Sequence, residues 1–522
     1  MNQQSSRWST ALHHLKHVLR ARDALRVTTP IGGVLVPALR VGVSMAIPIL
    51  LLVSLDRIDL VPFAALGSFT SLYCRVDTYS RRAWLQLLIA VGIVAGVAVG
   101  AVTSAASGGD IAKVLAVAAV ATAAKLFSDS LALGAPGGLM FAFAAGAAAY
   151  VPQQWSDVAL HVGVAAGSAA LSYALSMAGG MLHPSGPQRV ATARAASAVA
   201  DHLERGTPAT RHLAHAAVQR AMGTLSSGRA THDQLRGHLL HARRVLHRPE
   251  PGAAAALRAL AARVRRGRVP ESGGPAAETE VRSPRRTPWQ AVQPHLPNAA
   301  RMAVAALVSG LLVAAVHPDH AYWAVVSASS VLQATNATGT WHRALQRMCG
   351  TVVGGLITLV VFSFDPGPLV IIAVVVLAQV AAELVVMSNY ALGLTFATPI
   401  ALSLVALRQP GESFALVTER VGTTLVGAAI GTAVSLLLIN RHIAHRLEHA
   451  LLRCERAQAE LRSCAPERLA PARAGLLSSV FALRDAHSLA DGELWPRQKR
   501  TQEVLDTEHR AYALLAESVP VR

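Results

Sequence analysis

Long apolar windows alternate with short polar segments along most of this chain. A helix that crosses a membrane needs about 20 mostly apolar residues. Six such windows occupy 35–55, 58–73, 84–104, 111–128, 131–150 and 157–182, and six more occupy 299–316, 321–338, 348–364, 367–387, 390–407 and 414–439. The pattern predicts an all-α membrane protein with twelve spans, of which the second in each set is short.

Polar segments separate the two sets of windows and divide the chain into six parts. Leu and Val recur at roughly helical spacing in the two longer polar segments, whereas Pro, Gly, Ser and Arg dominate the stretch before the second set. We expect a cytoplasmic N-terminal amphipathic segment, a first six-span block, a cytoplasmic helical domain, a flexible linker, a second six-span block and a C-terminal helical domain, at 1–34, 35–182, 183–266, 267–298, 299–440 and 441–522.

Two fixed offsets relate landmarks of the two membrane blocks. An offset of 261 residues places Arg40 on Arg301 and Arg82 on Arg343, and an offset of 259 places 132–134 on 391–393. Such matches predict an internal repeat. Because each half has an even number of spans, the repeats would be parallel and related by an axis along the membrane normal. Cytoplasmic helical hairpins or bundles would follow each half.

Composition supports the membrane assignment and charge gives it an orientation. The 522 residues are 52% hydrophobic and only 15% charged, which excludes ordinary soluble enzymes, collagen-like fibres and disordered proteins. The net charge is +18, and residues 183–298 hold 18 Arg against 7 acidic residues. Basic segments of membrane proteins face the cytoplasm and attract anionic lipids. We therefore expect both termini and this insert to be cytoplasmic.

Motifs for catalysis or metal binding are missing from the sequence. The four cysteines have no CxxC spacing, and the 21 histidines form no recognisable ligand set with carboxylates or thiols. Searches for P-loop, zinc-protease and nucleophile-elbow motifs find none. The basic insert also lacks the interleaved aromatic residues of a nucleic-acid interface. We expect no enzyme, no metal, no cofactor and no nucleic-acid partner.

Glycines recur four residues apart in several windows. Such spacing lets membrane helices approach closely, so we expect these glycines to lie at helix contacts. They are Gly92, Gly96, Gly100, Gly163, Gly167, Gly350, Gly354, Gly427 and Gly431.

Two ionisable residues, Lys125 and Glu383, lie deepest in the apolar windows. A charge at this depth persists when it is paired or faces water, and it marks a transport pathway. The 259-residue offset places Glu383 opposite position 124, so we predict an ion pair across the axis between the halves. The alternative is that Lys125 reaches the headgroups past Asp129 while Glu383 finds another partner.

Polar residues interrupt the two short windows at corresponding positions, which is a pointer to a binding site. We expect these segments and the loops after them to line the cytoplasmic mouth of a pathway. Arg82 and Arg343 would attract organic anions there as carboxylate partners, or else anchor the helices at the headgroups. The pathway residues predicted here are Ser68, Arg82, Ser330, Gln333, Asn336 and Arg343, with Lys125 and Glu383 deeper.

The second block resembles the core of the fusaric acid resistance or aromatic acid exporter family. The resemblance rests on Tyr322-Trp-Ala-Val-Val-Ser-Ala-Ser-Ser-Val-Leu-Gln333, Thr340-Trp-His-Arg-Ala-Leu-Gln-Arg347 and Gly350-Thr-Val-Val-Gly-Gly355. Residues 63–73 and 79–82 resemble the diverged partner segment in the first block. The resemblance implies an inner-membrane efflux transporter for small aromatic or related organic acids, with two six-span halves.

Two alternatives to an exporter stay open. A more distant resemblance to plant malate channels implies a passive organic-anion channel. A scaffold that transports nothing and binds partners or lipid through its basic cytoplasmic helices is the competitor from another class. Because the chain lacks a nucleotide-binding motif, we expect active transport to draw on a gradient. Assembly into a homo-oligomer is also compatible with the sequence.

Overall fold

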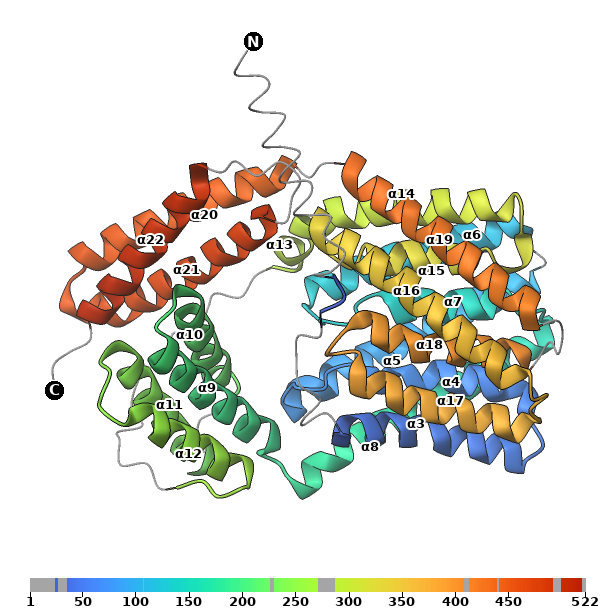
Figure 1. Cartoon of the computed structure of the whole chain (residues 1–522), viewed down its shortest axis with the longest axis horizontal. Helices are drawn as coiled ribbons and strands as arrows, with labels where there is room; N and C mark the ends of the chain where they lie inside the picture. The colour runs from blue at the N-terminus through green and yellow to red at the C-terminus, as the bar shows by residue number, and fades with distance from the viewer. Residues whose placement is uncertain are drawn as a thin grey trace, which may run out of the picture.

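Helices form every regular element in the part of the chain that the structure describes (Figure 1). The structure is a computed structural model. It describes residues 24–26, 35–106, 108–225, 230–270, 287–407, 413–438, 441–491 and 499–518. The predicted all-α class is thereby confirmed for these residues.

The first membrane block contains six long or short α-helices and two 3₁₀ turns. They are α3 (Leu35–Ser54), η1 (Ile58–Leu60), α4 (Val61–Ser68), η2 (Phe69–Leu72), α5 (Tyr79–Ala105), α6 (Asp110–Ser130), α7 (Leu139–Ala149) and α8 (Trp155–Leu182). From α14 onward, the second membrane block repeats the alternation of longer and shorter helices. It contains α13 (Pro288–Val292), η3 (Gln293–His295), α14 (Leu296–Ala314), η4 (Pro318–His320), α15 (Tyr322–Val331), α16 (Ala337–Phe362), α17 (Pro368–Val385), α18 (Tyr390–Ala406) and α19 (Ser413–Leu437).

Eight helices of the described residues are long and apolar enough to cross a membrane. These eight confirm a multi-pass membrane protein, but they are fewer than the twelve predicted spans, of which only those at 58–73 and 321–338 were expected to be short. The windows at 58–73, 131–150, 321–338 and 390–407 fold instead around the shorter helices α4, α7, α15 and α18. In the window at 131–150, Gly134 and Gly137 adopt positive φ angles and Pro136 lacks a backbone donor, so α7 begins only at Leu139.

The short helices lie inside the membrane bundle rather than against lipid. All ten residues of α15 are buried, as are seven of the eight residues of α4. Both helices carry apolar or small residues on every side, which suits burial on every side. The irregular backbone at their ends is tolerated at membrane depth because protein surrounds it. Most large exposed apolar side chains of the membrane blocks instead belong to the long helices, for example Val36, Leu50, Val91 and Leu377.

The two membrane blocks pack against each other through matching helices. Helix α3 contacts α17, and α14 contacts α6. Among the short helices, α4 contacts α18 and α15 contacts α7. One hydrophobic core crosses this boundary, since Ile372 and Val375 of α17 cluster with Val41 and Met45 of α3.

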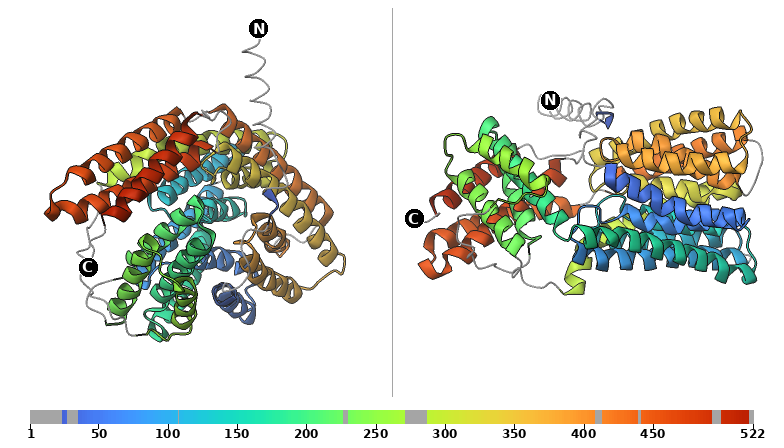
Figure 2. Two further views of the ribbon diagram at one scale, coloured as in Figure 1. Left: turned by 60° about the vertical axis from the view of Figure 1, so that its left-hand side comes forward. Right: turned by 90° about the horizontal axis from the view of Figure 1, so that it is seen from below.

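Two further groups of helices lie beyond the membrane blocks, each with its own apolar core. The insert block comprises α9 (Gly186–Arg205), α10 (Pro208–Met222), α11 (Ala230–His247) and α12 (Ala253–Arg265). The C-terminal block comprises α20 (Arg441–Ser463), η5 (Pro466–Arg468), α21 (Leu469–Asp491) and α22 (Lys499–Glu517). Figure 2 shows both at the same end of the membrane helices, which we call the block end. The opposite end is called the far end.

The expected linker is partly helical. Residues 288–298 belong to α13, η3 and the start of α14, whereas 271–286 lie outside the described residues. Thr287 caps this helical stretch, because its side chain accepts a hydrogen bond from Gln290 N and the Gln290 side chain accepts one from Thr287 N. The expected N-terminal segment lies outside the described residues apart from 24–26.

Seven of the nine predicted glycines lie at helix contacts. Gly92, Gly96 and Gly100 face α7, Gly350 and Gly354 face α18, and Gly427 and Gly431 face α15. The prediction is wrong for Gly163 and Gly167, since a methyl group on either would meet nothing within 4 Å. Helix α8 packs through its next face, where Ala165 and Ala169 meet Gly67 of α4.

Candidate functional site

Three cavities follow one another along the boundary between the two membrane blocks. The inner cavity, about 480 Å³, lies at the block end among Asp129, Gln333, Thr335, Arg446 and Asp485. The central cavity, about 210 Å³, lies within the bundle, and the outer cavity, about 60 Å³, lies near the far end among Pro62, Tyr150, His320, Tyr322 and Leu404.

Neighbouring cavities share residues of their walls. Ala135, Pro136 and Arg343 line both the inner and the central cavity. Phe143 and Ala401 line both the central and the outer cavity. The three spaces therefore form one line from the block end to the far end, and the line narrows toward the far end.

The central cavity combines guanidinium groups with apolar and aromatic walls. Its charged residues are Arg75, Arg343, Arg347, Arg420 and Glu383. Its rings are Phe69, Phe143 and Tyr390. A mostly apolar pocket with a few fixed polar groups is the usual form of a small-molecule site. The excess of guanidinium over carboxylate favours an anionic ligand.

Arg343 and Arg347 are held on one wall by α15 and α18. They stand one turn apart on α16, so both face the same side. Arg347 donates from Nε to Ser327 Oγ at 3.2 Å and from Nη1 to Tyr390 Oη at 3.3 Å. The Arg343 guanidinium lies over the Tyr390 ring, 5.2 Å from its centre. These contacts orient the two cations while leaving donors for a ligand.

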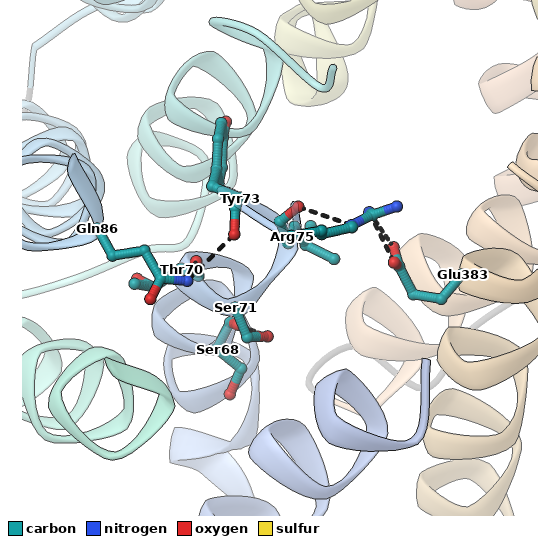
Figure 3. A network of polar contacts seen from close by, with 8 residues as sticks. Ser68, Thr70, Ser71, Tyr73, Arg75, Gln86 and Glu383 are labelled. Carbon is teal, nitrogen blue, oxygen red and sulfur yellow. Dashed lines mark hydrogen bonds and ion pairs between the residues drawn. The ribbon is translucent and has the colours of Figure 1, made fainter. Parts of the chain in front are cut away.

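Arg75 and Glu383 form an ion pair that joins the two membrane blocks. Arg75 Nη2 lies 2.8 Å from Glu383 Oε1 and 2.6 Å from Oε2. Arg75 also donates from Nε to Leu72 O at 2.9 Å. Figure 3 shows the guanidinium reaching from the loop after η2 to α17. Because each charge neutralises the other, this pair leaves the remaining three arginines as the net charge of the cavity wall.

Polar contacts fix the segment that carries Arg75 (Figure 3). Gln86 of α5 donates from Nε2 to Thr70 O at 3.4 Å and to Tyr73 O at 3.1 Å. Tyr73 Oη donates to Gly137 O at 2.7 Å, which ties the segment to the loop before α7. Ser71 Oγ donates to Ser68 O within the turn. The ion pair therefore stands on a well-anchored loop.

The predicted pair between Lys125 and Glu383 is wrong. Lys125 Nζ lies 3.0 Å from Asp129 Oδ1, one turn away on α6, and 3.5 Å from Gln333 O. Glu383 is satisfied by Arg75, which follows the apolar window at 58–73. Of the open alternative, the part in which Glu383 has another partner agrees with these contacts, whereas Lys125 is buried and ends at Asp129 instead of reaching the headgroups past it.

The other predicted pathway residues separate into two groups. Arg343 and Gln333 line cavities, and Asn336 caps α16 while donating from Nδ2 to Ser488 O of the C-terminal block at 3.5 Å. The remaining three make structural hydrogen bonds. Arg82 donates to the carbonyls of Cys74, Arg75, Asp77 and Ser176. Ser68 bonds to Ser44, Ala64 and Ser168, and Ser330 bonds to Ser327. Their part in a pathway stays a prediction.

Four residues of the central cavity were not predicted from the sequence: Arg75, Arg347, Tyr390 and Arg420. Arg347 could have been found, because it stands four residues after Arg343 on the same predicted helix face. Arg420 could also have been found, because it lies inside the apolar window at 414–439. Arg75 gives no such signal, since a loop arginine at the basic side of a membrane protein is common.

Comparisons with known proteins place the second membrane block. Residues 305–434 match the family "Fusaric acid resistance protein-like". A similar protein is the "Uncharacterized membrane protein YvaC" of Bacillus subtilis (strain 168), 29% identical over 208 residues. The match covers 37% of this chain and 31% of that protein, so it spans under a third of the relative's length. No solved structure matches the chain. As the resemblance of residues 322–355 predicts, the second membrane block is similar to the fusaric acid resistance protein-like family over residues 305–434.

Proposed function

We propose that this protein exports small organic acids, aromatic acids among them, across the cytoplasmic membrane. The observation that carries the proposal is the line of three cavities between the membrane blocks, with Arg343, Arg347 and Arg420 in the wall of the central one. Guanidinium groups bind carboxylates through paired hydrogen bonds. The rings of Phe69, Phe143 and Tyr390 offer apolar and aromatic contact for the rest of such a molecule.

The two membrane blocks are two parallel six-helix repeats in this proposal. Contacts between the blocks support it, because corresponding helices pack in the same way: α3 of the first block contacts α17 of the second, and α14 of the second contacts α6 of the first. A pair of ring contacts supports it as well. Arg420 of α19 lies over Trp323 of α15 at 4.7 Å, and His161 of α8 stacks on Phe63 of α4 at 4.0 Å. An axis along the membrane normal would relate these positions and pass between the cavities.

The block end faces the cytoplasm in this proposal. Lys and Arg concentrate in cytoplasmic loops, and the block-end loops and helix starts carry Arg75, Arg81, Arg82, Arg343 and Arg347. The far-end segments carry the acidic residues Asp56, Asp59, Asp110, Asp157, Asp319 and Asp365. Both cytoplasmic blocks would then lie where anionic lipid headgroups attract their arginines.

Transport would begin at the inner cavity. An organic anion entering there meets Arg343, which faces both the inner and the central cavity. Arg347 takes up the carboxylate one turn deeper, and the rings contact the apolar part of the molecule. Passage through the narrow outer cavity then requires the short helices around it to move apart. A gradient supplies the energy, with Glu383 as the carboxylate placed to exchange a proton beside the substrate.

A passive anion channel is the second candidate function, and the same arginine-lined cavities favour it. A non-transporting scaffold is less well supported, because a scaffold gains nothing from buried guanidinium groups around a cavity. The exporter and the channel differ in coupling. Only the exporter accumulates an organic anion against its own gradient.

The test uses the full chain in liposomes loaded with labelled benzoate, with and without a pH difference across the membrane. We expect flux that a pH difference drives uphill, and a loss of about tenfold or more in Arg343→Gln and in Arg347→Gln, because each removes a charged hydrogen-bond donor. Arg57→Gln is the matched control, since Arg57 is exposed and pairs with Asp59. Flux that only dissipates a gradient would favour the channel. Flux no greater than that of empty liposomes for a panel of aromatic acids would refute both.

A further inference from the structure

Arg420 is a buried cation with an incomplete set of partners. It lies on α19, its side chain is 4% exposed, and it lines the central cavity. Its Nε and Nη1 atoms are buried and have no hydrogen-bond partner. The Trp323 ring covers the guanidinium from one side, 4.7 Å away. An uncompensated buried charge is costly, so a cation kept in this state points to an anion that completes it.

The position of Arg420 relative to Arg347 follows from α15. Arg347 donates to Ser327 Oγ, and Arg420 lies over Trp323. Ser327 and Trp323 stand four residues apart on α15, which is about 6 Å along a helix axis. The two guanidinium groups therefore lie at different depths of one cavity, with Arg347 nearer the block end and Arg420 nearer the far end.

Charge balance in the central cavity favours a ligand with more than one negative charge. Four arginines and one glutamate line it, and Arg75 pairs with Glu383. Arg343, Arg347 and Arg420 remain without a carboxylate among the lining residues. A monoanion bound at Arg343 and Arg347 leaves the Arg420 fork unfilled. A second acidic group on the same molecule reaches it.

We propose that Arg420 is a second anion-binding point, and that the central cavity takes organic dianions whose two acidic groups lie at opposite ends of the molecule. This inference rests on the proposed function and specifies its substrate class. One carboxylate binds Arg343 and Arg347, the apolar body lies against the rings, and the second carboxylate accepts hydrogen bonds from the Arg420 guanidinium. The transported species thus carries two charges per molecule.

The test compares the binding of benzoate, 1,2-benzenedicarboxylate and 1,4-benzenedicarboxylate to the full chain in detergent by titration calorimetry. We expect the 1,4 isomer to bind about tenfold more tightly than benzoate, since it gains a charged hydrogen-bonded contact. The 1,2 isomer places both carboxylates together and should gain less. Arg420→Gln should abolish the preference, so that the 1,4 isomer binds no more tightly than benzoate. Arg57→Gln should leave all three affinities unchanged.

Arg420→Lys provides a second variant if Arg420→Gln does not fold. It keeps the charge but loses the planar fork, so the preference for the 1,4 isomer should fall severalfold. Equal binding of benzoate and the 1,4 isomer in the unmodified protein overturns the inference and leaves the proposed function standing. A preference for the 1,4 isomer that survives in both Arg420 variants overturns the inference as well. Benzoate binding that requires chloride also overturns it, because a separate ion would then supply the second negative charge. Failure of all three acids to bind refutes the proposed function together with the inference.

Discussion

Buried ion pairs in this protein have partners from very different places in the chain. Lys125 pairs with Asp129 on its own helix, whereas Glu383 pairs with Arg75 from the other membrane block. The Arg75–Glu383 pair joins the blocks across the central cavity, with side chains only 15% and 6% exposed. It therefore stabilises the contact between the blocks as well as the two charges themselves.

The residue-scale prediction concerns this pair. Glu383→Gln and Arg75→Gln should each lower the free energy of unfolding by about 3–5 kcal/mol, because each leaves one buried charge without its partner. The double variant should lose clearly less than the sum, since it leaves neither charge behind. Thermal unfolding of the purified protein in detergent measures all three.

An exposed pair provides the control for this cycle. Arg57→Gln breaks the Arg57–Asp59 contact, whose side chains are 44% and 50% exposed, and should change stability by less than about 1 kcal/mol. Additive effects of the Arg75 and Glu383 substitutions would show that the two side chains do not interact as the geometry requires.

The sequence identifies buried charges more readily than their partners. Glu383 stands out in an apolar window, and its place at a cavity follows the rule that charges at depth serve a pathway. Its partner could not be predicted, because residues 75 and 383 lie in different membrane blocks and come together through the packing of the blocks on each other. The Lys125 partner was available one turn away, but helix spacing alone did not favour it over a partner in the other block.

At the scale of the helices, glycines determine how closely neighbours approach. A methyl group on Gly354 would lie 2.7 Å from Thr395 O and 2.7 Å from Thr398 Cβ of α18. Gly163 on α8 has the same spacing in sequence but faces open space. The GxxxG pattern thus marks a helix contact in α5, α16 and α19 and an exposed face in α8.

The element-scale prediction uses this contrast. Gly354→Ala should destabilise the protein by about 1–3 kcal/mol, because α16 and α18 must separate to admit the added carbon. Gly163→Ala should be neutral or stabilise by up to about 1 kcal/mol, because alanine favours the helix and meets no neighbour. Unfolding temperatures of the two variants check this. Equal effects of the two substitutions would contradict the assignment of helix contacts.

Helix lengths show which features of the fold the apolar windows predict and which they do not. Apolar windows predict the position of every helix in the two membrane blocks except the short α13, because burial in lipid or protein requires apolar residues in either case. They do not separate a lipid-facing span from a helix enclosed by other helices. The mostly apolar short helices α4, α7, α15 and α18 therefore looked like spans, although all four lie inside the bundle and contribute walls of the outer cavity.

At the scale of the whole molecule, the insert block and the C-terminal block meet through histidines. His215 of α10 stacks on Tyr512 of α22, with ring centres 4.6 Å apart, and contacts His247 at 5.1 Å. His212 Nδ1 lies 3.2 Å from Tyr512 Oη. Glu508 pairs with Arg484 beside this contact at 2.8 Å. The C-terminal block in turn lines the inner cavity through Asp485, so the histidine contact helps to place that wall.

Burial makes this contact sensitive to acid. It lowers the pKa of His212 and of His247 from 6.5 to about 4, and it lowers the pKa of His215 well below 6.5. When the blocks separate, these histidines regain their ordinary pKa and bind protons more readily. Their contribution to association is therefore complete above about pH 6.5 and is lost progressively as the pH falls toward 4. Burial raises the pKa of Glu508, which acts in the opposite direction but involves one group.

We therefore predict that the two blocks separate in the full-length protein as the pH is lowered from 7 to about 4.5. The experiment uses a chain whose native cysteines are replaced and that carries Arg244→Cys and Arg462→Cys, at exposed positions on the two blocks. Energy transfer between fluorophores on these two cysteines reports the distance between the blocks. The double variant His215→Phe and His247→Phe keeps the ring contacts but cannot be protonated, so its response should be much smaller. His449→Gln, at an exposed position, should respond as the unmodified protein does. An unchanged distance down to pH 4.5, or an equal response in the double phenylalanine variant, would show that these histidines do not hold the blocks together.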